Sequence, residues 1–599
     1  MLRDHLEYLV RDGLIGVAAH RELEFFFRHG LIQDAAYSTL LKPQRLAWHR
    51  AAGEVLEAQL QSSPAPEAVQ SLAPLLAQHF SIAGDDERAI RYFTRAAEAA
   101  FQRYANEEAS DYYARAFALA TRDGAVYDPG LVLALTLGYG RALELRSQFE
   151  AALRHYEAAG ALAQRHADRT LELATLVERA KILSTVNLSS DPEQSRALLE
   201  QAAPLAESLG DHATEARLYW TLMLQNTMRG GDLDERIAYG ERSLAVARQL
   251  RLREQLAYTH QDLYFGYGGR CQWQQARATL LEARRLWREL DNPVGESEVV
   301  LRLSQVAMFT GDYDESVAAV DEGHRLAHTS NSADMQALSH AFVGLIHAER
   351  GDYAQACALA EAAVAVGETT GNVTVLAGTQ ADLGWAFGEL GAAGQGLALA
   401  QAARTVAETR FPLLTPWPAA SVARLHLLRG EVAEAGDALA AQPPYPEVQR
   451  RTGFLVMMWL NVALAEAELA LARGRATEAA AAMAEVAEGM QATGTRFHLP
   501  DVLYLRGQAL LAQGRLAQAR SELQAARLEA LALGSRRMLW RILVALAEVE
   551  SQTGQAARAA AWRREAQPEV AYIASHAPTP ELRDSFLSLP SVQAVLHST

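Results

Sequence analysis

The hydrophobic and polar positions of this chain alternate with the period of an α-helix along most of its length. Between residues 69 and 565, apolar residues recur three and four positions apart, as in LVALAEVE after Ile542. This period is typical of amphipathic helices that bury one face. Short turns rich in glycine and polar residues separate the apolar stretches. The pattern therefore predicts an all-α protein built from many short helices.

The turns repeat at a nearly constant interval. GDLDERI begins at Gly231, GDYDESV at Gly311 and GDYAQAC at Gly351. Weaker copies begin at 391, 430, 474, 514 and 554, with Cys271 in the equivalent place, so the successive spacings from 231 are 40, 40, 40, 40, 39, 44, 40 and 40 residues. Earlier copies lie at 84 and 147, and a weaker one surrounds 191. Such self-similarity indicates a repeat array of about eleven or twelve helical hairpins.

Small residues occupy two fixed positions around each turn, and both favour close helix packing. At the position five residues after the start of each turn, the small residues are Ala89, Ala276, Ser316, Ala356, Gly396, Ala435, Ala479, Ala519 and Ala559. At the position seven residues before the start of each turn, the small residues are Ser304, Gly344, Gly384, Ala423, Ala467 and Gly507. We expect the two positions to meet between antiparallel helices, and we expect each unit to touch only its neighbours.

This pattern resembles the tetratricopeptide repeat, whose usual length is about 34 residues. The longer unit resembles the repeats of large bacterial signal-transduction ATPases, including those associated with adenylate cyclases, and of maltose-regulator-like activators. FFFRHGLIQDAAYSTLL at 25–41, LAQHFSIAGDDERAIRYFTRAAEAA around Gly84 and ELRDSFLSLPSV at 581–592 resemble segments of the same family. The resemblance implies a partial winged-helix segment over 1–60, a linker over 61–68, a superhelical solenoid of tetratricopeptide type over 69–565 and a tail over 566–599.

Composition and motifs disfavour an enzyme. The formal net charge of -16 argues against a nucleic-acid or anionic-membrane partner for the whole chain. The two lysines, Lys42 and Lys181, lie outside any Gly-Lys-Ser/Thr phosphate loop, so we carry over no nucleotide hydrolysis from the family. Cys271 and Cys357 form no metal or disulfide pattern, which favours a reducing cytoplasm. We expect no cofactor, metal or catalytic residue, and the N-terminus does not read as a signal peptide.

Histidines offer two further candidate clusters. His324 and His328 stand four residues apart on one predicted helix, and His340 and His347 lie on the next. This spacing is compatible with a metal, but ordinary helix histidines are the favoured interpretation because no cysteine or carboxylate completes a ligand set. The second cluster joins His29 and His49 to Arg28 and Arg45, for which the resemblance implies a structural role.

The residue six positions before each turn is predicted to face the concave groove, where repeat proteins commonly bind. These residues are Gln225, Phe265, Gln305, Leu345, Trp385, Arg424, Glu468 and Gln508, with Gln261, Ala381 and Tyr504 one turn earlier. Our predicted partner-binding residues are Gln225, Phe265, Gln305, Trp385, Arg424 and Gln508. The mixture of polar and aromatic groups suits a peptide or a sugar. Packing between helices is the competing interpretation for each.

The sequence thus predicts a non-enzymatic sensor or scaffold of a bacterial regulatory system. A protein or peptide is the expected partner, a small ligand is an alternative, and self-association stays open. Two rival interpretations are a transcription regulator that uses the winged-helix remnant, and the regulatory half of an ATPase or adenylate cyclase encoded upstream.

Overall fold

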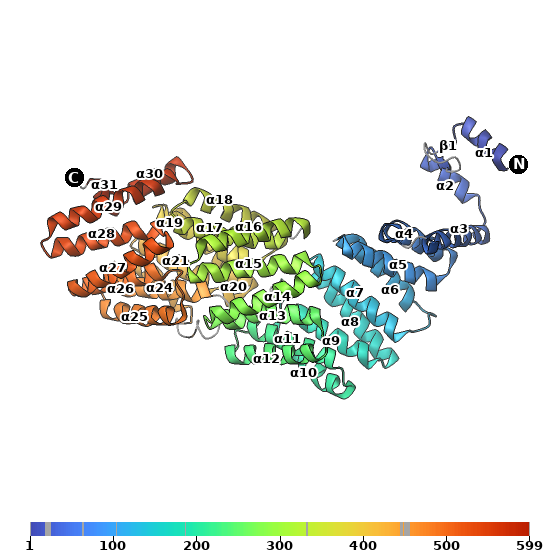
Figure 1. Ribbon diagram of the computed structural model, residues 1–599, viewed down its shortest axis with the longest axis horizontal. Coiled ribbons are helices and arrows are strands. Elements are labelled where there is room, and N and C mark those ends of the chain that lie inside the picture. Colours follow the sequence, from blue (N-terminus) through green and yellow to red (C-terminus); the bar gives the residue numbers. More distant parts are fainter. Residues whose placement is uncertain are drawn as a thin grey trace. The chain divides into compact units, whose positions relative to one another are not determined.

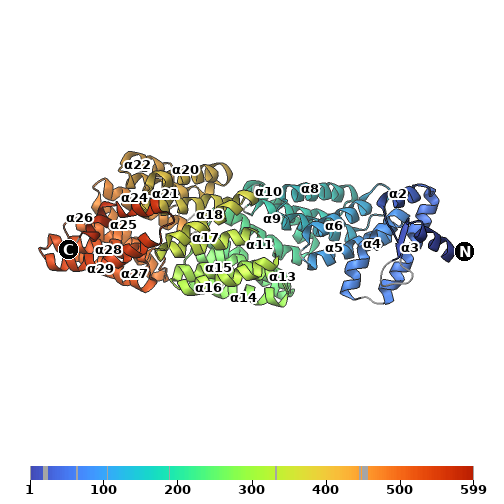
Figure 2. The same ribbon diagram turned by 90° about the horizontal axis from the view of Figure 1, so that it is seen from above.

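A computed structural model describes residues 2–17, 25–62, 65–103, 105–185, 187, 189–330, 333–443, 447 and 456–597 (Figures 1 and 2). Within these residues the structure is helical except for one short β-hairpin, which confirms the predicted all-α class. The chain divides into two compact units, Met1–Leu171 and Glu172–Thr599. The four segments that the sequence predicts, with boundaries at 60, 68 and 565, stay a prediction.

The first unit begins with elements that differ from the repeats. Helix α1 (Leu2–Arg11) leads into strands β1 (Ile15–Val17) and β2 (Phe25–Phe27), which pair antiparallel. Helices then follow: α2 (Gly30–Ser38), α3 (Lys42–Ser62), α4 (Pro66–Ala83), α5 (Asp86–Gln102), α6 (Asn106–Thr121), α7 (Pro129–Leu145) and α8 (Phe149–His166). Helix α9 (Arg169–Leu183) crosses the division between the units.

The second unit is a run of helices packed in consecutive pairs. They are α10 (Pro192–Leu209), α11 (His212–Met228), α12 (Leu233–Gln249), α13 (Arg253–Gly269), α14 (Trp273–Glu289), α15 (Pro293–Thr310), α16 (Tyr313–Ser330), α17 (Ala333–Glu349), α18 (Tyr353–Thr370), α19 (Gln380–Glu389), α20 (Ala393–Arg410), α21 (Pro416–Leu428), α22 (Val432–Ala440), α24 (Val456–Ala472), α25 (Ala476–Thr493), α26 (Leu499–Ala512), α27 (Leu516–Leu533), α28 (Arg536–Gln552), α29 (Ala556–Ser575), α30 (Pro580–Leu587) and α31 (Pro590–Leu596). A π-helical turn (Val375–Thr379) precedes α19, and a 3-10 turn (Pro412–Leu414) precedes α21.

The turn GDY at 351–353 illustrates why the sequence folds into hairpins. Gly351 ends α17 with φ of 81°, a left-handed conformation that glycine adopts without steric cost. The carboxylate of Asp352 then accepts a hydrogen bond from the backbone N–H of Gln355 at 3.2 Å and so caps α18. Tyr353 follows and is buried beneath the turn. Three successive residues thus end one helix, start the next and fix their packing.

The paired small residues lie where the sequence predicts them. A Cβ atom built on Gly384 would lie 2.6 Å from the carbonyl oxygen of Gly396, and one built on Gly344 would lie 3.2 Å from that of Ala356. In the preceding pair, the hydroxyl of Ser316 donates to the carbonyl of Ser304 at 2.8 Å. The two helices of a hairpin therefore approach almost to backbone contact.

The expectation that each unit touches only its neighbours is wrong for the second unit. The indole N–H of Trp273 donates to the hydroxyl of Thr495 at 2.8 Å, across 222 residues of sequence. The backbone N–H of Ala354 donates to the carbonyl of His576 at 2.7 Å. Gly311 packs on Leu533, and α17 lies beside α28 (Figure 1). The superhelix therefore brings turns near 271, 311 and 351 against turns near 495, 535 and 575.

Among the described residues, no helix combines the length and the apolar character needed to cross a membrane.

Candidate functional site

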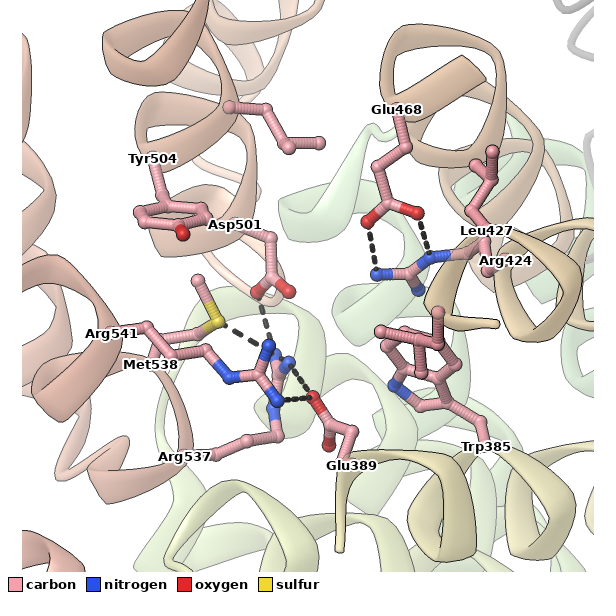
Figure 3. A pocket seen from close by; sticks show the side chains of 12 residues that line it. Trp385, Glu389, Arg424, Leu427, Glu468, Asp501, Tyr504, Arg537, Met538 and Arg541 are labelled. Carbon is pink, nitrogen blue, oxygen red and sulfur yellow. Dashed lines mark hydrogen bonds and ion pairs between the residues drawn. The ribbon is translucent and has the colours of Figure 1, made fainter. Parts of the chain in front are cut away.

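A cavity of about 200 Å³ opens on the inner surface of the second unit (Figure 3). Its walls come from α19, α21, α24, α26 and α28, which belong to successive repeat units. The lining residues are Trp385, Glu389, Arg424, Leu427, Leu428, Glu468, Asp501, Tyr504, Leu505, Arg537, Met538 and Arg541. Polar and apolar side chains therefore line the same open pocket.

Arg537 is the centre of a buried ionic network at the base of this pocket. Its Nη2 atom lies 2.6 Å from Oδ2 of Asp501 and 2.6 Å from Oε1 of Glu349, and its Nη1 atom lies 3.3 Å from Oε1 of Glu389. All four side chains are at most 5% exposed. Glu349 and Glu389 end α17 and α19, whereas Arg537 begins α28, so the network joins distant repeats.

Neighbouring hydroxyl groups complete the shell of these carboxylates. Tyr353 donates its phenolic proton to Glu389 at 2.8 Å, and the hydroxyl of Ser535 donates to Glu349 at 2.7 Å. Burial alone would raise the pKa of Asp501, but Arg537 and His498 hold that pKa well below its usual range. Asp501 is therefore ionised at neutral pH.

Glu349, His498 and Asp501 also bring three donor atoms within 4.8 Å of one another, a spacing that suits a metal ion. The guanidinium group of Arg537 already supplies the positive charge there, because it contacts both carboxylates at 2.6 Å and lies 3.4 Å from Nδ1 of His498. An arginine in this position acts as the resident cation. This arrangement favours a structural ion network over a metal centre.

A second ion pair lies across the pocket, and it includes Arg424, one of the predicted partner-binding residues. Arg424 donates through Nε and Nη2 to the two oxygens of Glu468 at 2.9 and 2.8 Å. Its guanidinium group also stacks over the indole of Trp385 at 3.8 Å. The structure thus brings together three residues that stand six positions before their turns.

The other predicted partner-binding residues lie outside this pocket. Gln225 is buried and donates to the carbonyl of Pro192 at 3.2 Å. Arg302 stacks over Phe265 at 4.5 Å, and Gln305 accepts a hydrogen bond from Tyr264 at 2.7 Å. Gln508 lies on α26, one turn beyond the pocket residue Tyr504. Their part in binding stays a prediction.

Sequence reasoning named Tyr504 but missed three charged pocket residues near the starts of α26 and α28. Asp501, Arg537 and Arg541 are charged residues within otherwise apolar helical stretches. A charge on a buried helix face is a usable signal, because such a residue needs a partner. The glutamate partners of Arg537 and Arg541 could not be identified from the sequence, since they stand about 150 residues or more away.

The histidine clusters have local partners. The ring nitrogens Nδ1 of His49 and His79 lie 2.8 Å apart, and Nε2 of His49 lies 3.1 Å from the hydroxyl of Tyr37, which links α2, α3 and α4. The rings of His324 and His340 pack at 4.7 Å between centroids. His347 lies 3.6 Å from Asp352, and the side chain of His328 lies outside the described residues. The structural role expected for His49 fits these contacts.

Comparisons with known proteins identify similar folds but no sequence family. No family model matches the chain, and no curated protein matches it. The chain is similar in structure to Cut9 in the APC/C hetero-tetramer Cut9-Hcn1, with 14% identity and a TM-score of 0.44 over 94% of this chain and 98% of that chain. It is also similar to a signal transduction ATPase with numerous domains and a tetratricopeptide repeat sensor from Pyrococcus horikoshii, with 13% identity and a TM-score of 0.37 over 75% and 60% of the respective chains.

A third similar structure is the apo form of RapI, with 12% identity and a TM-score of 0.35 over 73% of this chain and 98% of that chain. The helical hairpins with paired small residues place the protein in a class by their own geometry. It is an all-α solenoid of the tetratricopeptide-like type.

Proposed function

We propose that this chain is a non-enzymatic interaction module of a bacterial regulatory system, whose second unit binds a segment of a partner protein or peptide in the inner pocket. The observation that carries the proposal is the pocket itself, which five helices of successive units line with aromatic, aliphatic and charged groups. Ligand sites commonly combine a concave apolar wall with a few polar groups that fix orientation. A small ligand is the alternative occupant, because the cavity is only about 200 Å³.

The arrangement of charges supports binding over catalysis. The carboxylates that line the pocket each have an arginine partner, and Asp501 is held ionised. A general acid or base would need a carboxyl group whose pKa is raised toward neutrality. The lining thus offers groups suited to recognition.

Site-specific photocrosslinking tests the proposal. A benzophenone amino acid replaces Tyr504 in the pocket or Leu528, which is 64% exposed on α27 and contributes nothing to the pocket. In extract from the source cells, we expect one partner to crosslink through position 504 and not through 528. Equal labelling from both positions would contradict a pocket site.

The purified partner then allows a measurement of affinity. We expect Trp385→Ala to weaken binding by more than about 1 kcal/mol, as at interface hot spots. Trp562→Ala is the matched control, because Trp562 also carries a stacked arginine, at 5.3 Å, and lies outside the pocket. Unchanged affinity in the Trp385 variant would place the partner elsewhere.

A further inference from the structure

Arg541 differs from the other two arginines that line the pocket. Arg424 is matched by both oxygens of Glu468, and Arg537 contacts three carboxylates. Arg541 has one ion pair, 3.5 Å from its Nη2 atom to Oε1 of Glu389, and its guanidinium group lies 5.2 Å from the centre of the Trp540 ring. Its Nε atom is buried and has no hydrogen-bond partner. A guanidinium group carries five N–H donors, so most of its capacity is unused.

Glu389 does not depend on Arg541. Its Oε2 atom accepts from Tyr353 at 2.8 Å, and its Oε1 atom lies 3.3 Å from Nη1 of Arg537. If Arg541 turned toward a ligand, this carboxylate would keep two partners. Figure 3 shows the side chain of Arg541 at the edge of the open space, on the side opposite Arg424 and Trp385. The group is therefore available at little cost to the buried network.

The lining carboxylates are occupied, in contrast with Arg541. Asp501 is held by Arg537 at 2.6 Å, and Glu468 accepts two hydrogen bonds from Arg424. A cationic ligand would have to compete with these arginines for its partner. An anionic group would instead meet donors that have no strong partner. The hydrogen-bonding state of the pocket therefore selects an anion.

The remaining lining residues indicate which kind of group lies beside the bound anionic group. Leu427, Leu505 and Met538 give the cavity an apolar wall. Its volume of about 200 Å³ is below the roughly 300–1,000 Å³ of sites for drug-sized molecules. It suits one short acidic side chain beside an apolar neighbour. Arginine binds a planar carboxylate through two parallel hydrogen bonds, and a single carboxylate is small enough for this volume.

We propose that Arg541 binds a carboxylate in this pocket, supplied by an acidic residue next to an apolar residue in the bound segment. This inference rests on the proposed function and specifies the ligand chemistry of the same site. A free small carboxylic acid would present the same group, and the experiment separates the two sources.

Saturation-transfer NMR with the full chain tests the inference. The probes are the capped tripeptides acetyl-Leu-Glu-Leu-amide, acetyl-Leu-Gln-Leu-amide and acetyl-Leu-Lys-Leu-amide, together with glutarate. We expect the glutamate peptide to bind at least about ten-fold more tightly than the other two peptides, since a charge-assisted hydrogen bond is replaced by a weaker one. Binding of glutarate alone would keep the carboxylate site and assign it to a free acid.

Two variants and one control make the result specific to Arg541. Arg541→Gln should abolish the preference for glutamate, and Arg541→Lys should retain part of it. Arg527→Gln should leave it unchanged, because Arg527 pairs with Glu565 outside the pocket. Thermal melts establish that each variant is folded, and Arg541→Lys provides the charge-retaining comparison if Arg541→Gln is not.

Three results would overturn the inference: tighter binding of the lysine peptide, an unchanged preference in Arg541→Gln, or no binding of any probe at millimolar concentration. None of these results decides the proposed function, because crosslinking through position 504 is independent of ligand charge. Conversely, a glutamate preference that depends on Arg541 would survive even if no protein crosslinks through that position.

Discussion

Replacement of Arg537 by methionine should destabilise the protein by about 3–5 kcal/mol at neutral pH, the usual cost of leaving buried charges unpaired. Arg537 lies within 2.6–3.3 Å of three carboxylates that are 3–5% exposed. At about 4 Å between charge centres and an effective dielectric constant of about 20, each attraction is worth about 4 kcal/mol before desolvation is subtracted. Methionine fills much of the same volume, so the lost charge dominates the effect.

The loss should depend on pH in a defined direction. In the native protein the pKa of Asp501 is depressed, so its contribution to stability is complete above the ordinary aspartate pKa and disappears as the pH falls through the folded value. Without Arg537, the three carboxylates repel one another, and the pKa of Asp501 rises in the folded state because its main cationic partner is lost. Part of the lost stability should therefore return as the pH is lowered from 8 to 5.

Differential scanning calorimetry at pH 5 and pH 8 measures both effects. Arg536→Met is the matched control, since its side chain is 41% exposed and has one carboxylate partner, Glu569. We expect less than about 1 kcal/mol from that change. Two results would refute the assignment of a buried ionic network. One is an equal decrease in melting temperature for Arg537→Met and Arg536→Met. The other is a stability loss in Arg537→Met that is as large at pH 5 as at pH 8.

Three further predictions concern other buried positions. Burial raises the pKa of Asp382 to about 7, so ionisation of this carboxyl group opposes folding progressively as the pH rises from about 4 to 7 and fully above 7. Asp382→Asn should therefore stabilise the protein by about 4 kcal/mol at pH 8 and by almost nothing at pH 4, measured by urea unfolding, and equal effects at both pH values would contradict this. Gly384→Ala should lower the free energy of unfolding by about 1–3 kcal/mol, because the new Cβ atom would lie 2.6 Å from the carbonyl oxygen of Gly396. Gly489→Ala, in open space on α25, should raise it by about 0.5–1 kcal/mol. An unchanged free energy of unfolding in Gly384→Ala would disprove the close helix approach. Burial raises the pKa of Cys271 to about 11 and that of Cys357 to about 12, so both thiols should resist iodoacetamide at pH 7.5 until the protein is denatured, and mass spectrometry showing rapid native labelling would argue against their burial.

The sequence predicted the local architecture well because each repeat encodes its own hairpin. The glycine and aspartate of the turns specify helix ends, and the small residues of the pairs such as Gly384 and Gly396 specify close packing. The predicted groove register also located Trp385, Arg424 and Glu468 at the pocket. It could not identify the partners of Arg537, because the superhelical rise and twist decide which distant turns meet. Those parameters depend on small rotations at every helix contact, which no single residue determines.

The contacts across 222 residues fix how many repeats the second unit can contain. Linear solenoids gain and lose whole units in evolution, since a new unit needs only two compatible neighbours. Here a duplicated 40-residue unit between Glu389 and Thr495 would move one side of these contacts by a full repeat. Trp273 would then face a different turn, and Arg537 would lose Glu349 and Glu389. The contacts between distant turns therefore restrict the number of repeats. Residues within a repeat can be substituted, but duplication of a whole repeat is selected against.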